Sequence, residues 1–83
     1  MIDVKNATKL AVEYIKSVYS GCKEIKLEEV DSSEDDKFWY ITLSFILKED
    51  AEDILFIKRQ YKIIKINALT GKIQSMKIRQ LNE

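Results

Sequence analysis

The hydrophobic pattern of this chain changes its period once, at Gly21, and this change limits the fold more than any other feature. Before Gly21, apolar residues recur at spacings of three and four, as in an amphipathic helix. After Gly21, apolar and polar residues alternate over several segments, as in half-buried strands. Because a chain of 83 residues has room for only one core, the sequence predicts a single α+β domain over residues 1–83.

The helix is predicted from about residue 4 to residue 19. Asp3 can act as its N-cap, because a carboxylate there accepts hydrogen bonds from free backbone N–H groups of the first turn. Gly21 suits the left-handed position that follows a helix C-terminus. The expected apolar stripe contains Val4, Ala7, Leu10, Ala11, Tyr14, Ile15 and Val18.

Four antiparallel strands are predicted after the helix. They cover residues 25–28, 38–47, 54–66 and 72 to about 79, and the connectors lie at 31–36, 49–53 and 67–71. The second strand is the strongest, because aromatic and β-branched residues fill it. In the turn at 67–71, Gly71 is free to take a positive φ. The last strand is expected to bury Ile73 or Met76, together with Ile78.

One helix can cover one face of this sheet, so we expect the other face to be open. If Trp39, Ile41, Leu43, Phe45 and Leu47 face the helix, the residues between them lie on the far face. The candidate partner surface there contains Phe38, Tyr40, Ile46 and Tyr61. The alternative is that these side chains are scattered and partly shielded by lysine stems.

The charged residues are divided along the chain, although the formal net charge is zero. Residues 1–53 hold 7 basic and 13 acidic side chains, and residues 54–83 hold 7 basic and 1 acidic. Cross-strand pairing of opposite charges explains such a division without a partner. A polarised surface that orients a charged partner is the functional alternative.

Catalysis, metals and cofactors are not expected. The chain has no histidine to activate Cys22, its single cysteine, which we expect to be a buried small side chain. The spacing of Asp31, Ser33 and Asp35 is that of calcium-loop ligands, but Asp36 stands where such a loop requires glycine. The two glycines lie far apart and cannot form a phosphate-binding loop.

Composition also indicates the class of protein. No secretion signal or apolar run long enough to span a membrane is recognisable, and a lone cysteine forms no internal disulfide. We therefore expect a cytoplasmic protein without a membrane partner. The basic residues from Lys58 to Arg79 leave nucleic-acid binding through the C-terminal strands as an alternative, against a sequence pI of about 6.3.

The segment 61–73 resembles the end of a PepSY domain. In that family, alternating apolar residues, an Asp or Asn, an Ala, and Thr-Gly with a following aliphatic residue close a β-hairpin. The matching positions here are Ile64, Ile66, Asn67, Ala68, Thr70, Gly71 and Ile73. The chain also looks like a group of short stand-alone bacterial proteins of unassigned activity.

This resemblance implies a helix followed by antiparallel strands, an order that cystatins share, and a role without catalysis. PepSY modules are thought to bind or inhibit peptidases or to act as adaptors. The sequence therefore favours a non-catalytic protein-binding or regulatory module, with a protein partner or self-association. A peptidase inhibitor or immunity-type protein, whose acidic connectors would block a basic site, is the alternative within this class.

Overall fold

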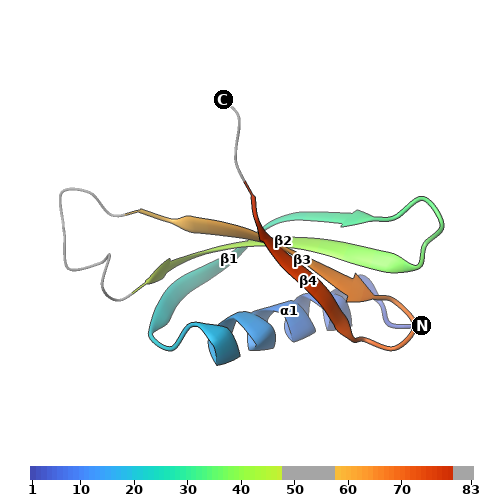
Figure 1. Cartoon of the computed structure of the whole chain (residues 1–83), viewed down its shortest axis with the longest axis horizontal. Helices are drawn as coiled ribbons and strands as arrows, with labels where there is room; N and C mark the ends of the chain where they lie inside the picture. Colours follow the sequence, from blue (N-terminus) through green and yellow to red (C-terminus); the bar gives the residue numbers. More distant parts are fainter. Residues whose placement is uncertain (48–57, 80–83) are drawn as a thin grey trace.

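The computed structural model describes residues 1–47 and 58–79, and it has the predicted α+β architecture (Figure 1). The elements are α1 (Val4–Val18), β1 (Cys22–Ser32), β2 (Phe38–Leu47), β3 (Gln60–Asn67) and β4 (Ile73–Ile78). The strands form one sheet in the order β1-β2-β3-β4, and every neighbouring pair is antiparallel. Helix α1 lies against one face of this sheet (Figure 1).

The start of α1 confirms the predicted N-cap, while at its end Gly21 follows the C-cap Tyr19 by two residues, one position later than predicted. Asp3 has an extended backbone, and its carboxylate accepts a hydrogen bond from the N–H of Asn6 at 2.9 Å. Gly21 follows the helix with a φ of +85°. The apolar stripe is narrower than predicted, because Val4 and Val18 are exposed and only Ala7, Ala11 and Ile15 are fully buried. The residues that α1 buries completely lie in its middle turns, and its end residues stay partly exposed.

The core lies between α1 and the centre of the sheet. Its sheet side consists of Ile41, Leu43 and Phe45 from β2 and Ile64 and Ile66 from β3, all without exposed surface. Trp39 and Leu47 pack at its margin, which confirms the predicted side of β2 that faces the helix. The ring of Tyr19, just after α1, lies 5.0 Å from that of Phe45, centroid to centroid.

The outer strands differ most from expectation. Strand β1 is longer than the predicted 25–28, and its pairing with β2 is irregular between Lys23 and Lys26 and between Leu27 and Glu29. Strand β3 begins at Gln60, while residues 54–57 of the predicted strand lie outside the described residues. In β4, Ile73 and Met76 pack against the core, but Ile78 is 72% exposed. Its predicted burial is wrong: Ile78 lies on the edge strand β4, and its neighbour on β3 is Lys62 rather than an apolar residue of the core.

Hydrogen bonds join the N-terminus to the turn between β3 and β4. The N–H of Ile2 donates to the carbonyl of Ala68 at 2.8 Å, and the indole N–H of Trp39 donates to the carbonyl of Ile2 at 3.1 Å. In the turn, the side-chain oxygen of Asn67 accepts from two backbone N–H groups, and Gly71 has a φ of +79°. The turn prediction is therefore confirmed, including the positive φ.

Candidate protein-binding face

The face of the sheet opposite α1, which we call the far face, has no described helix against it (Figure 1). It is open only in part, because Thr42, Ser44 and Ile46 of β2, which lie on it, are buried. The strand register arranges its side chains in rows. One row runs from Asp31 of β1 through Tyr40 and Lys65 to Ser75 of β4. The next row runs from Glu29 through Thr42 and Ile63 to Lys77. Each row thus begins with an acid on β1 and has a lysine on β3 or β4.

Two of the predicted partner residues, Phe38 and Tyr40, lie beside the same lysine, Lys65. The Lys65 ammonium lies 4.2 Å from the centroid of the Phe38 ring and 5.9 Å from that of the Tyr40 ring. Both distances allow cation–π attraction. Both rings are half-buried, so part of each is available to a partner. The sequence placed these aromatic residues on the far face, but the strand register is what brings Lys65 to them.

An open groove of about 280 Å³ crosses the far face beside these rings. Tyr40, Ile63, Lys65, Ser75 and Lys77 line it, and three strands contribute to it. The groove combines an aromatic ring, an aliphatic side chain, two hydroxyl groups and two ammonium groups. We call these five residues the lysine groove.

The other two predicted partner residues lie outside the lysine groove. Tyr61 is half-buried and stands opposite Ser44 in the pairing of β2 with β3. Ile46 is only 6% exposed, so its side chain offers almost no contact area. Of the four predicted residues, the structure therefore groups Phe38 and Tyr40 with the groove and leaves Ile46 and Tyr61 apart from it.

Polar bridges occupy the rest of the far face. The Ser44 hydroxyl donates to the Glu28 carboxylate at 2.5 Å and accepts from the Arg59 Nε at 3.1 Å. Ser44 is completely buried, so these bonds satisfy its hydroxyl rather than present it to a substrate. Further along, Arg79 pairs with Glu29 at 3.3 Å, across a sequence separation of 50 residues. The Arg79–Glu29 contact joins opposite charges, whereas Arg59 is linked to the Glu28 carboxylate only through the Ser44 hydroxyl.

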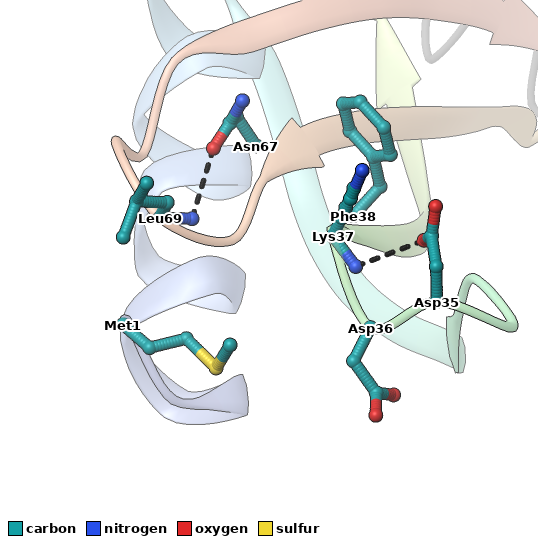
Figure 2. Close-up of a pocket in the computed structure, with 7 residues that line it drawn as sticks. All are labelled: Met1, Asp35, Asp36, Lys37, Phe38, Asn67 and Leu69. Carbon is teal, nitrogen blue, oxygen red and sulfur yellow. Dashed lines mark hydrogen bonds between the residues drawn. The ribbon is translucent and has the colours of Figure 1, made fainter.

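A second cavity of about 280 Å³ lies at the end of the sheet, where the N-terminus and two turns meet (Figure 2). It is lined by Met1, Asp35, Asp36, Lys37, Phe38, Asn67 and Leu69. Its polar groups already have local roles, since Asp35 accepts from the N–H of Lys37 and Asn67 accepts from the N–H of Leu69 (Figure 2). Bonds from the Ser33 hydroxyl and the Lys37 N–H lower the pKa of Asp35.

The acidic connector at 31–36 and Cys22 both have structural roles in the fold. Ser33 and Asp35 bond to each other at 2.6 Å and to the backbone at Lys37, which closes the hairpin between β1 and β2. Within residues 1–47 and 58–79, no group of three or more His, Cys, Asp or Glu side chains could hold a metal ion. Cys22 is half-buried and packs at the margin of the core, so it is less buried than expected.

In the described part of the chain, no helix has the length and apolar character needed to cross a membrane. No family model, no curated protein and no solved structure shows a significant match to this chain.

Proposed function

We propose that this chain is a non-catalytic protein-binding module and that its partner docks on the far face of the sheet. The observation that carries the proposal is the lysine groove beside the half-buried rings of Phe38 and Tyr40. Aromatic side chains that keep part of their surface exposed are typical of the central residues of protein interfaces. The long stem of Lys65 adds apolar area to the same patch.

The resemblance of 61–73 to a PepSY domain supports the same class of function. In this chain the turn residues of that motif stabilise the hairpin, because Asn67 accepts from Leu69 and Thr70, and Thr70 accepts from the N–H of Lys72 at 3.2 Å. The turn joins β3 to β4, and past an irregularity between Lys65 and Ile66 the strand register places Lys65 beside Ser75 and Ile63 beside Lys77. The proposed binding surface thus depends on the motif without including it.

The position of Lys65 favours a protein over a nucleic acid. Proteins that bind single strands stack bases on exposed aromatic faces. Here the Lys65 ammonium lies 4.2 Å from the centroid of the Phe38 ring, so it occupies a face of that ring on which a base would stack. The same arrangement leaves ring edges and lysine stems for contact with protein side chains.

The test is affinity capture from a lysate of the source organism with the full chain and two variants. Tyr40→Glu places a charge in the patch, and Lys9→Glu, on the exposed side of α1, is the matched control. We expect the full chain and Lys9→Glu to capture the same protein, and Tyr40→Glu to lose it while keeping its circular dichroism spectrum. Equal capture by all three would show that the far face is not the binding surface.

A further inference from the structure

The two lysines of the lysine groove lack acidic partners in the part of the chain that the structure describes. There, Arg79 and Glu29 form the ion pair across the sheet, and no carboxylate lies within 4.0 Å of Lys65 or Lys77. The acids nearest to them in the rows, Glu29 and Asp31, lie on β1, three strands away from Lys77. Among the residues that the structure describes, the groove therefore carries positive charge that no ion pair compensates, on the β3 and β4 side of the far face.

The spacing of the two lysines is set by the sheet. Lys65 pairs with Ser75 and Ile63 pairs with Lys77, so the lysines are diagonal neighbours on adjacent antiparallel strands. Such neighbours lie about 7–8 Å apart. In an extended peptide, alternate residues point to one side and lie about 6.6–6.8 Å apart. Acidic side chains at alternate positions of an extended segment therefore match the spacing of the two lysine positions on the sheet.

The remaining lining suits the same occupant. Ile63 and the ring of Tyr40 provide an apolar surface for aliphatic stems, and the hydroxyl groups of Tyr40 and Ser75 can donate to carboxylate oxygens. Cation–π contacts already hold the Lys65 ammonium in place, so less side-chain entropy is lost when a carboxylate binds there.

From this charge, spacing and lining we infer the chemistry of the partner: an extended polypeptide segment with acidic residues at alternate positions, seated in the lysine groove. The inference rests on the protein-binding function proposed above and adds what the far face recognises. Lys65 and Lys77 each bind one carboxylate, and Tyr40 and Ile63 contact the stems between them.

The test uses the full ¹⁵N-labelled chain and short peptides with both ends capped. The first peptide alternates glutamate with valine, the second has glutamine in place of glutamate, and the third has the first peptide's composition with its glutamates consecutive. We expect the first to shift amide signals of β2, β3 and β4 around the groove. The second and third should bind at least about fivefold more weakly, because they lack the charge or its spacing.

Variants of the chain locate the binding site. Lys77→Gln should weaken binding of the alternating peptide about three- to tenfold, Lys77→Arg should largely restore it, and Lys9→Gln on α1 should leave it unchanged. Raising the salt concentration should weaken the same complex. Lys77 is exposed, so its replacement leaves the core intact.

Several results would overturn this inference. One is equal binding of the glutamine peptide, and another is a set of shifted amides away from the groove. A single-stranded oligothymidylate that binds more tightly and displaces the peptide would assign the groove to nucleic acid. A dimer in sedimentation equilibrium that Lys77→Gln dissociates would assign it to a second copy. Capture that depends on Tyr40, together with failure of the alternating peptide, would refute this inference and leave the proposed function standing.

Discussion

At the scale of single residues, polar side chains define the ends of elements by satisfying backbone N–H groups. Asp3 accepts from the N–H of Asn6, Ser33 from those of Lys37 and Phe38, and Asn67 from those of Leu69 and Thr70. In each case a short side chain bonds to backbone a few residues further on, which favours turns and helix starts over regular structure. These residues determine where the chain changes direction.

Replacement of the helix N-cap tests this role. Asp3→Ala removes the acceptor for the Asn6 N–H, and we expect it to lower the free energy of unfolding by about 1 kcal/mol. Asp3→Asn is the control, because asparagine caps about as well as aspartate. Urea unfolding followed by circular dichroism measures both. Equal stability of the alanine and asparagine variants would contradict the assigned cap.

The hairpin between β1 and β2 gives a pH-dependent prediction. The Ser33 hydroxyl, followed by the Lys37 N–H, lowers the pKa of Asp35 in the folded chain. A lowered folded-state pKa stabilises the hairpin above the ordinary aspartate pKa, and this contribution is lost as the pH falls through the folded-state value. Carboxyl ¹³C NMR titration should show the lowered pKa, and Ser33→Ala should raise it. An unchanged pKa in that variant would exclude the hydroxyl as its main cause.

At the scale of elements, α1 approaches the sheet closely because its buried face is small. Ala7 and Ala11 have no exposed surface, and Ile15 is the one large residue that α1 buries completely. The large core side chains come instead from β2 and β3. The helix thus supplies a flat contact surface, and the sheet supplies most of the core volume.

A larger side chain at the contact between α1 and the sheet should lower the free energy of unfolding. Ala11→Leu forces extra methyl groups into a filled core, and we expect a loss of about 1–3 kcal/mol in the free energy of unfolding. Lys9→Leu is the matched control, because it adds the same side chain at an exposed position of α1. Thermal unfolding of the two variants makes the comparison. Similar stabilities would mean that the helix does not lie on the sheet as closely as described.

The sequence predicted elements with strong periodic patterns and was less successful at the edges of the sheet. Strand β2 matches its predicted bounds, since five alternating apolar side chains have only one face on which to be buried. Strand β1 contains two irregularities, and Glu24 has a φ of +50°, so strict alternation fails there. Ile78 looked buried because it continued the pattern of β4, but periodicity does not show where the core ends.

The candidate site was predictable only in part for a related reason. Alternation along β2 indicates that Phe38 and Tyr40 share a face, whichever strands lie beside it. The lysine groove also depends on which residues of β3 and β4 stand opposite each other, and a slip of one residue would move Lys65 to the helix side. Register is set by the turn at 67–71 and by core packing, so the sequence pattern alone could not bring Lys65 and Lys77 to Tyr40.

At the scale of the whole molecule, the two faces of the sheet have different roles. One packs against α1 and contains the core, while the other carries polar bridges and the lysine groove. The partly exposed side chains of the far face can then change with little effect on folding. Both edge strands also limit unwanted pairing, β1 through its irregular pairing and its charges, and β4 through its short length and Lys77.

This difference between the faces predicts that two side-chain truncations in β2 lower the free energy of unfolding by unequal amounts. Leu43→Ala on the helix side leaves a cavity in a fully buried cluster and should lower the free energy of unfolding by about 2–5 kcal/mol. Tyr40→Ala on the far face removes a half-buried ring and should cost about 1 kcal/mol, since part of that ring already meets solvent. Denaturant unfolding of both variants gives the two values. If Tyr40→Ala proves as costly as Leu43→Ala, the far face is part of the core, and its aromatic residues are held there by folding rather than kept for a partner.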